Sequence, residues 1–365
     1  MTAFLPAETP ITAALLRESN GGHVPSEMKA DGRIAFRVKA LPAGGEASYF
    51  AEEGESAARA QKGGAAAVQD REAVKLTIDG KPILAYQTSR EPKRKEIPSE
   101  YWRSGYLHPV YSPAGVVVTD DYPKDKLYQH GIWSGWQKVD FGYSHPDFWD
   151  ASRRKGRISM ESVGPLWGGP VATGFEARQY LTDMDARVGS TVLREAWSVT
   201  AFREASRVPY FVVDLESRQD PMNGLVVLGE SSLGGITIRG NRDWQGASKS
   251  IFLSSEGTER SQAQGAPARW CYLGGKSGGK QAGVAILAHP QNPKAPEAVF
   301  IDPEEPVMGF APTKNGAISL KPGAALYLRY RFVVLDGKPD SKLFDRLWND
   351  FANPPVVRVR GLGEK

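Results

Sequence analysis

The stretch "STVLREAWSVTAF", residues 190–202, favours a β-strand. From Trp197 to Ala201 apolar and polar residues alternate, which is the period of a strand with one buried face. Similar runs, separated by turn residues, follow one another along the chain: GVVVTD (115–120), GRISMESV (156–163), FEARQYL (175–181), VPYFVVDLES (208–217), GLVVLGE (224–230), GGITIRG (234–240), AGVAILAHP (282–290) and AALYLRYRFVVLDG (324–337). Because no helices alternate with these runs, we predict an all-β fold, a large antiparallel β-sandwich, rather than a βαβ fold.

Two local signals lie near the limits of this sandwich. In "AVKLTIDGKPILAYQT", residues 73–88, Asp79-Gly80 predicts a hairpin turn between two strands. In "DSKLFDRLWNDF", one apolar stripe behind a capping Asp340 predicts one C-terminal helix, over residues 340–352. We therefore expect an irregular N-terminal arm with the first strands over residues 1–70, and a single sandwich domain over residues 71–365. Residues 44–68, rich in Ala, Gly and Glu, predict a surface excursion within that arm.

The composition is that of a globular protein and narrows the possible functions. Of 365 residues, 41% are hydrophobic, and no apolar run is long enough to span a membrane. The net charge is only +4, and basic and acidic residues are interspersed, so we expect neither a nucleic-acid nor a membrane partner. The single Cys271 excludes an intramolecular disulfide and lies in a strand-like run, where a buried, unreactive thiol is expected.

One segment is too polar for a core strand and too aromatic for an ordinary loop. It is "DDYPKDKLYQHGIWSGWQKVDFGYSHPDFWD", residues 120–150. A sugar site needs flat aromatic platforms beside short polar groups, because a sugar has hydroxyl groups at its rim and C–H bonds on its faces. Trp133, Trp136 and Trp149 are candidate platforms, and we expect Trp133 or Trp136 to line a cavity together with His130. The alternative is a structural role, in which the tryptophans pack the edge of the sandwich.

Histidines give the sequence a candidate for proton transfer. His130 lies in the aromatic segment, His108 lies just upstream, and His289 ends a later strand-like run. Histidine titrates near neutral pH and can act as a general acid or base. His23 has no such context and is expected at the surface. A divalent metal ion held by His and Asp is an open alternative, although no two histidines have a standard zinc spacing. Serine-nucleophile and nucleotide-binding patterns are absent, so no organic cofactor is expected.

Motifs in these segments resemble those of a bacterial family labelled PmoA-like. The motifs are YLHPVYSPAG, VTDDYPKD, QHGIWSGW, HPDFW and GVAILAHPQNPKAP, within residues 76–337. The residues on motif positions are His108, Asp120, Asp121, Gln129, His130, Trp133, Asp147, Trp149, His289 and Asn292. Lys126 and Tyr128 depart from the pattern, where relatives often carry histidines, so a shared metal or mechanism does not follow.

The resemblance implies a galactose-mutarotase-like supersandwich and a place in bacterial glycan degradation. The family label refers to a methane oxygenase, but that subunit is an integral membrane protein and this sequence has no spanning segment. We expect a periplasmic or extracellular protein, although no signal peptide is visible, because no basic segment precedes the apolar residues near the N-terminus.

These observations lead us to expect a carbohydrate-active enzyme, a glycoside hydrolase or a lyase, acting on a glycoside or an oxidised (keto or uronic) sugar. His108 and His130 are the expected acid and base, and Asp121 or Asp147 is expected to orient an imidazole. Tyr111 or Tyr128 is an alternative proton donor, since a phenol can protonate a leaving group. The residues expected to bind the carbohydrate are Arg103, Tyr111, Gln129, Trp133, Trp136, Lys138, Trp149, His289 and Asn292. A non-catalytic glycan-binding protein and a sugar epimerase or mutarotase are the alternatives.

Overall fold

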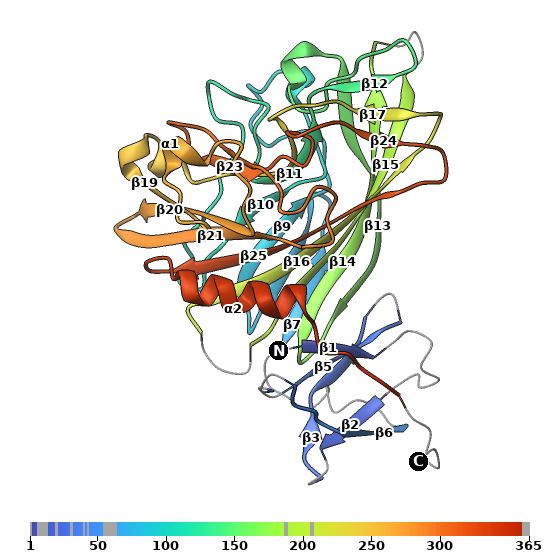
Figure 1. Cartoon of the computed structure of the whole chain (residues 1–365), viewed down its shortest axis with the longest axis vertical. Coiled ribbons are helices and arrows are strands. Elements are labelled where there is room, and N and C mark those ends of the chain that lie inside the picture. Colours follow the sequence, from blue (N-terminus) through green and yellow to red (C-terminus); the bar gives the residue numbers. More distant parts are fainter. Residues whose placement is uncertain are drawn as a thin grey trace.

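Two large antiparallel sheets dominate the structure, which is a computed structural model (Figure 1). It describes residues 2–5, 14–18, 21–29, 32–38, 41, 44–53, 64–185, 189–204 and 208–359. Each large sheet has eight strands, and all pairs of neighbouring strands in both are antiparallel, so the predicted all-β sandwich is confirmed.

The first sheet contains the predicted hairpin. Its strands, in spatial order, are β22 (Val299–Ile301), β23 (Val307–Phe310), β18 (Gly234–Arg239), β11 (Ile132–Trp136), β10 (Leu107–Val110), β9 (Lys81–Gln87), β8 (Ala73–Ile78) and β7 (Ala65–Gln69). Asp79 and Gly80 join β8 to β9 with φ angles of 50° and 76°, the left-handed region that a two-residue hairpin turn requires. β7 overlaps the end of the expected surface excursion, so part of that segment is an ordered edge strand.

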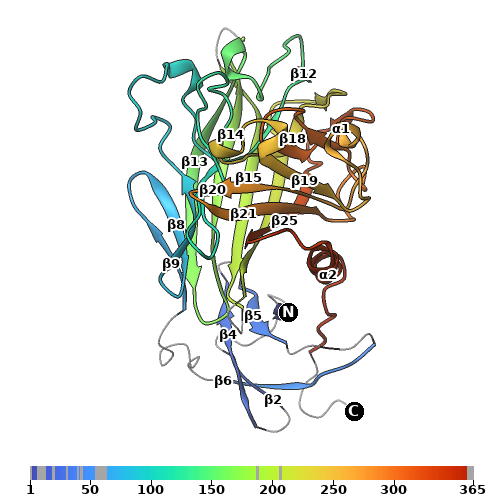
Figure 2. The ribbon, with the colours of Figure 1, turned by 90° about the vertical axis from the view of Figure 1, so that its left-hand side faces the viewer.

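The second sheet contains the long strands seen upright in Figure 2. Its spatial order is β13 (Gly156–Gly168), β14 (Ala172–Asp183), β15 (Ser190–Phe202), β16 (Tyr210–Pro221), β25 (Leu326–Asp336), β21 (Lys280–Ala288), β20 (Trp270–Ser277) and β19 (Ser250–Ser254). The stretch 190–202 is β15, and Trp197 pairs with Ala177 of β14 and Ser217 of β16. Trp197, Val199 and Ala201 are buried in the main core, as the alternation predicts.

Short elements connect and cover these sheets. A three-stranded sheet is formed by β12 (Val139–Phe141), β17 (Val226–Leu228) and β24 (Ile318–Leu320). The 3₁₀ helices are η2 (Ser99–Tyr101), η3 (Ala151–Arg153), η4 (Arg242–Trp244) and η5 (Ala247–Lys249), and α1 (Arg260–Ala263) is one turn long. The expected strand at 115–120 makes only isolated bridges, from Val117 to Tyr111 and from Thr119 to Gly240.

The predicted C-terminal helix is α2 (Ser341–Ala352). The Asp340 carboxylate accepts hydrogen bonds from the backbone N–H groups of Lys342 and Leu343, which caps the helix as expected. Its apolar stripe buries Phe344, Leu347 and Phe351 against the second sheet. No helix among the described residues is long and apolar enough to cross a membrane.

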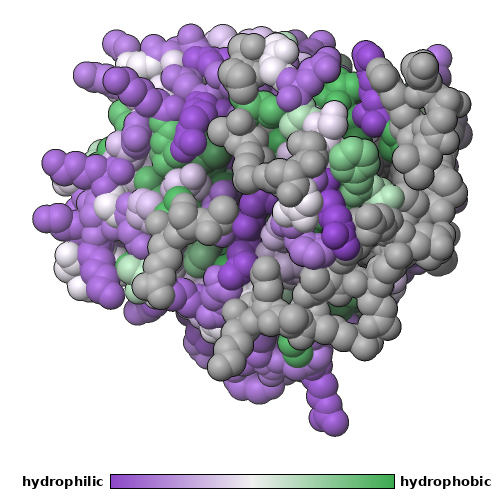
Figure 3. Space-filling model, turned by 90° about the horizontal axis from the view of Figure 1, so that it is seen from below, coloured by the Kyte–Doolittle hydropathy of each residue, from purple (hydrophilic) through white to green (hydrophobic). Residues whose placement is uncertain are grey.

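The N-terminal strands form two small sheets of their own below the sandwich (Figure 1). One consists of β1 (Thr2–Leu5), β5 (Ile34–Arg37) and β4 (Ser26–Met28), and the other of β3 (His23–Val24), β2 (Ala14–Glu18) and β6 (Tyr49–Glu53). Their separate hydrophobic cluster includes Leu16, Val24 and Phe36, and Val357 from beyond α2 packs against it. In Figure 3, which shows this end from below, hydrophobic side chains reach the surface between hydrophilic ones.

Candidate functional site

A cavity of about 460 Å³ lies at one end of β13. The residues at the start of β13, Gly156 to Ile158, line it. Gly168, at the other end of the strand, lies so close to β7 that an added Cβ atom would be 2.5 Å from the Ala65 carbonyl oxygen. Glu27 of the N-terminal sheets accepts a hydrogen bond from the nearby Val171 N–H. The cavity is therefore at the end of the sandwich opposite the N-terminal sheets.

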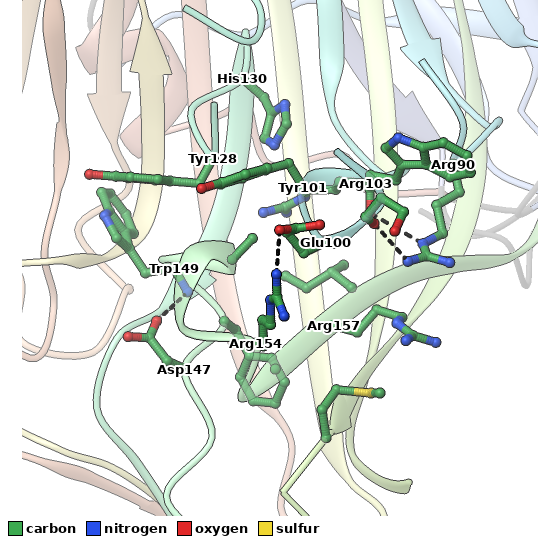
Figure 4. Close-up of a pocket in the computed structure, with 17 residues that line it drawn as sticks. Arg90, Glu100, Tyr101, Arg103, Tyr128, His130, Asp147, Trp149, Arg154 and Arg157 are labelled. Atoms are coloured by element: carbon green, nitrogen blue, oxygen red, sulfur yellow. Dashed lines mark hydrogen bonds and ion pairs between the residues drawn. The ribbon is translucent and has the colours of Figure 1, made fainter. Parts of the chain in front are cut away.

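Aromatic rings form much of the cavity wall. Tyr101 and Trp102 come from η2 and its C-cap, and Tyr128 and Trp149 come from the 120–150 segment. Figure 4 shows Tyr128, Trp149 and His130 on one side of the cavity, with Arg90 and Arg157 on the other. The full lining is Arg90, Ser99, Glu100, Tyr101, Trp102, Arg103, Tyr128, His130, Asp147, Phe148, Trp149, Ala151, Arg154, Gly156, Arg157, Ile158 and Met184.

His130 is the histidine that lines the cavity, and its ring is fixed by Asp121. Its Nδ1 lies 2.8 Å from the Asp121 Oδ1 atom, and the other carboxylate oxygen accepts a hydrogen bond of 2.9 Å from the Tyr106 hydroxyl. The rings of Tyr106 and Tyr122 pack against the imidazole at centroid distances of 4.6 and 4.7 Å. With Nδ1–H donated to the carboxylate, the lone pair is on Nε2, which has no hydrogen-bond partner among the described residues.

Burial keeps this histidine neutral. Desolvation lowers the pKa of His130 below its usual value, against the opposing effect of the Asp121 carboxylate. A neutral imidazole with a free Nε2 can accept a proton near neutral pH. Burial also raises the pKa of Tyr128, followed by the effect of the Asp150 carboxylate, so the phenol of Tyr128 retains its proton.

The backbone beside this pair adopts an uncommon conformation. Tyr122 has φ of 48°, in the left-handed region, which is unfavourable for a residue with a side chain. The N–H of Tyr122 donates to the Gln129 carbonyl oxygen at 3.1 Å. The carbonyl oxygen of Tyr122 accepts a hydrogen bond from the Arg94 guanidinium. These contacts hold the turn that presents Asp121 to His130.

His108 lies close to His130 but does not line the cavity. Leu107 of β10 pairs with Ile132 of β11, so His108 is beside Gly131, where a Cβ atom would lie only 2.0 Å from the Leu107 carbonyl oxygen. Glycine at 131 thus permits the close approach of the two strands. His108 Nδ1 is 2.9 Å from the Thr119 hydroxyl, and its charge contributes to the lowered pKa of His130.

Arg103 brings an incompletely paired cation to the cavity. Its side chain is 7% exposed, and one terminal nitrogen donates to the Ser134 carbonyl oxygen at 2.6 Å. The Nε atom is buried and has no hydrogen-bond partner. Burial lowers the pKa of Arg103 to about 10, against the opposing effect of Glu195, so the guanidinium remains charged at neutral pH.

Behind Arg103 the sandwich encloses a carboxylate. Glu195 is fully buried and accepts hydrogen bonds from Ser134, at 2.9 and 3.1 Å, and from Ser217 at 2.6 Å. Amide groups of Gln179 and Gln219 donate to the same carboxylate. Neutral side chains from both sheets therefore satisfy this internal charge.

The remaining acidic groups of the lining have structural partners. The Asp147 Oδ1 atom accepts the backbone N–H groups of Trp149 and Asp150, at 2.9 and 2.8 Å, and so shapes the turn that carries Trp149. Burial raises the pKa of Asp147, against these hydrogen bonds. Glu100 forms an ion pair of 2.6 Å with Arg154.

The structure brings some predicted site residues together and leaves others elsewhere. Arg103, His130, Asp147 and Trp149 line the cavity, and Asp121 contacts His130. Those that do not line this cavity are His108, Tyr111, Gln129, Trp133, Trp136, Lys138, His289 and Asn292.

Two of the three expected tryptophan platforms, Trp133 and Trp136, do not line the cavity, because both faces of β11 are covered. Trp133 is 0% exposed and packs behind Trp149, with ring centroids 5.4 Å apart. Trp136 is in the main core, and its indole N–H donates to Gln219. Gln129 accepts from Arg239 at 2.8 Å, and Lys138 is exposed just before β12.

His289 and Asn292 lie at the second sheet, near α2. The imidazole of His289 packs on Phe351, with ring centroids 4.9 Å apart. The amide of Asn292 donates 2.7 Å and 2.9 Å hydrogen bonds to the carboxylate of Glu297 and the carbonyl oxygen of Arg329. Asn292 therefore supports the fold around Glu297, and His289 supports the packing of α2 on the sheet. Cys271 is buried, as expected, and burial raises the pKa of its thiol; His23 is exposed, as expected.

Of the arginines in the lining, Arg103 was expected from the sequence, but Arg90, Arg154 and Arg157 were not. Two basic runs carry them, "SREPKRKE" (89–96) and "SRRKGR" (152–157), and these runs were the available signal. Their convergence depends on the path of the chain between them. Across the described ranges, no group of three or more His, Cys, Asp or Glu side chains is placed to hold a metal ion.

A family model described as a family of unknown function, DUF6807, matches residues 73–349. The match begins with β8, ends within α2 and includes every residue that lines the cavity. No curated protein matches the chain.

Proposed function

The chain belongs to the DUF6807 family, and within this family of unknown function we propose that it is a carbohydrate-active lyase that cleaves a uronic-acid glycan by elimination. The observation that carries the proposal is the cavity itself. It combines a neutral His130 oriented by Asp121 with a buried cation, Arg103, that has an unpartnered Nε atom.

His130 is the proposed base. In a uronic sugar the hydrogen on the carbon next to the carboxylate is weakly acidic, and its removal leaves charge on the carboxylate oxygens. Nε2 of His130 takes this proton, and Asp121 stabilises the imidazolium that results. Arg103 binds the carboxylate and stabilises the enolate-like charge.

Tyr128 is the proposed acid. As the C–H electron pair forms the new carbon–carbon double bond, the glycosidic C–O bond breaks and the leaving oxygen takes the phenolic proton. The imidazolium returns a proton to the phenolate through water after the products leave. No oxidant, reductant or water is consumed in the cleavage.

The cavity suits a sugar in size and in surface. Its volume of about 460 Å³ lies within the range of small-molecule sites. Trp149, Tyr101 and Trp102 offer flat apolar surfaces to the C–H faces of the ring, while arginines meet its acidic substituent.

Elimination is favoured over hydrolysis by the state of the two carboxylates in the lining. Glycoside hydrolysis commonly uses two free carboxyl groups, one as acid and one as base or nucleophile. Here Glu100 is paired with Arg154, and Asp147 holds the Trp149 turn through Oδ1, while its Oδ2 atom lies 3.4 Å from the Arg153 Nε atom. Hydrolysis, epimerisation and non-catalytic glycan binding are the competing functions, and the product distinguishes them.

The expected relationship to PmoA-like proteins and to galactose-mutarotase-like sandwiches is part of this proposal. The sequence motifs and the two eight-stranded antiparallel sheets support it. A polymeric uronic substrate also fits the proposed periplasmic or extracellular location, because such polymers are found outside cells.

The test compares substitutions of two buried histidines, His130 and His289, in the chain of 365 residues. Purified protein is incubated with polygalacturonate, alginate and glucuronan, and elimination is followed by the ultraviolet absorbance of the unsaturated product. His130→Gln is expected to lower turnover about a hundredfold or more, because the base is lost, while the melting temperature changes little. His289→Gln, a buried histidine outside the cavity, is expected to retain activity.

Full activity of His130→Gln would remove this residue from the mechanism. New reducing ends without ultraviolet absorbance would identify a hydrolase instead. Binding of a uronic glycan without any product would identify a glycan-binding protein.

A further inference from the structure

Arg90 and Arg157 form a pair of like charges on the cavity wall opposite His130 (Figure 4). Arg90 donates only to backbone carbonyl oxygens, those of Trp102 at 3.2 Å and Ser99 at 3.3 Å. Arg157 is exposed, and although its backbone pairs with Thr182 of β14, its side chain has no hydrogen bond or ion pair with any described residue. Neither guanidinium has a carboxylate partner in the described part of the chain.

The two guanidinium groups are close enough to repel each other. After burial, the charge of Arg157 is the largest cause of the lowered pKa of Arg90. Two neighbouring cations without a counter-ion are unfavourable, and an anion placed between them gains attraction from both. Arg154, which also lines the cavity, differs from these two arginines because it is already paired with Glu100 at 2.6 Å.

We propose that Arg90 and Arg157 bind the carboxylate of a second uronic residue, which is adjacent in the glycan to the residue that undergoes elimination. The inference rests on the proposed function, and it makes the substrate a contiguous polyuronate rather than a glycan with isolated acidic sugars. Arg103 holds the carboxylate of the reacting residue, and the Arg90–Arg157 pair holds that of its neighbour.

Three facts support a ligand at this place rather than a structural ion pair. Both arginines line the cavity that contains His130. Arg90 is oriented by two backbone hydrogen bonds, which leave its charge uncompensated. Arg103, whose side chain donates to the Ser134 carbonyl oxygen, adds a third cation to the lining of the same cavity.

The experiment compares two trimers. One is built of three uronic residues. In the other, the residue that undergoes elimination is still uronic, but its neighbour across the cleaved bond is neutral. The wild-type chain is expected to have a lower KM for the all-uronic trimer. Arg157→Gln is expected to raise that KM on the order of tenfold, the effect of losing one charge-assisted contact, with a much smaller effect on the mixed trimer. Arg157→Lys, which keeps the charge, is expected to restore part of the difference.

Arg218→Gln is the matched control, because Arg218 is similarly an exposed strand arginine but lies on β16, outside the cavity. It is expected to leave both KM values unchanged. Equal effects of Arg157→Gln on the two trimers, or equal KM values for wild-type protein, would overturn the proposed subsite.

Failure of the proposed function is distinguishable from failure of the subsite. If wild-type protein cleaves neither trimer, calorimetry measures their affinities directly. A preference for the all-uronic trimer that Arg157→Gln removes would then support the subsite without catalysis, and equal affinities would contradict it.

Discussion

Glu195 and the Arg90–Arg157 pair are charged groups on nearby parts of the same sandwich, but their surroundings are opposite. Glu195 is enclosed between the sheets and is fully supplied with neutral donors. Arg90 and Arg157 line an open cavity and have no acidic partner among the described residues. The comparison indicates that the protein's own donors satisfy the charge inside the fold, whereas the cavity arginines lack an acidic partner among the described residues. The proposed uronic carboxylates would supply that partner.

The largest expected effect follows from removing the enclosed carboxylate. Glu195→Ala leaves the hydroxyls of Ser134 and Ser217 and the amide of Gln219 without their acceptor. Because an unsatisfied buried polar group costs about 1–3 kcal/mol, we expect the free energy of unfolding in urea to fall by about 3–5 kcal/mol.

The control for this variant is Glu216→Ala, an exposed carboxylate on β16, expected to change stability by less than about 0.5 kcal/mol. Similar stabilities of the two variants would break the comparison, since the enclosed charge would then not support the fold.

A second enclosed carboxylate predicts how stability depends on pH. Burial raises the pKa of Glu297 from 4.5 to about 7. Between these values the unfolded chain loses the proton while the folded chain keeps it, so the free energy of unfolding falls as pH rises, by about 3 kcal/mol in all. Glu297→Gln is neutral at every pH, and denaturation at pH 5 and pH 7 should show a flatter dependence than wild type.

Glu27 has the same direction of shift, to a pKa of about 7, and remains in both proteins, so some dependence persists in the variant. An unchanged slope in Glu297→Gln would mean that Glu297 is already ionised in the folded protein at pH 5.

The smallest effect is expected at the arginine that already has a partner. Arg154 is 72% exposed and paired with Glu100, and exposed pairs contribute little. Arg154→Gln should leave the melting temperature unchanged and should alter the KM for an all-uronic trimer by less than about threefold. A rise equal to that caused by Arg157→Gln would show that paired and unpaired arginines do not differ in function, and a larger rise would reverse the expected order.

The fold class could be predicted from the sequence because the alternation of apolar and polar residues that marks a strand is a local pattern. The runs at 190–202 and 73–88 and the helix behind Asp340 form as predicted, since each depends on neighbouring residues and a turn or cap. The 115–120 run did not become a strand, although its valines have a high β-propensity. Its neighbours in space decide that outcome, and the sequence does not display them.

The candidate site was predictable in part for the same reason. His130, Asp121 and Trp149 were found because they cluster in one segment. Trp133 is indistinguishable from Trp149 by composition, and the cover on both faces of β11 keeps it out of the cavity lining. Arg90 and Arg157 are far apart in sequence and meet only after the hairpin and β13 are in place.

The packing of Val357 against the N-terminal cluster has a consequence for synthesis. The strands that carry Leu16, Val24 and Phe36 leave the ribosome early, but the residue that covers them is made only after the whole sandwich has been translated. During that interval the nascent chain exposes part of an apolar cluster. A chaperone acting on this protein would therefore find its binding site at the N-terminal strands, and synthesis of the segment that carries Val357 would be the event that closes it.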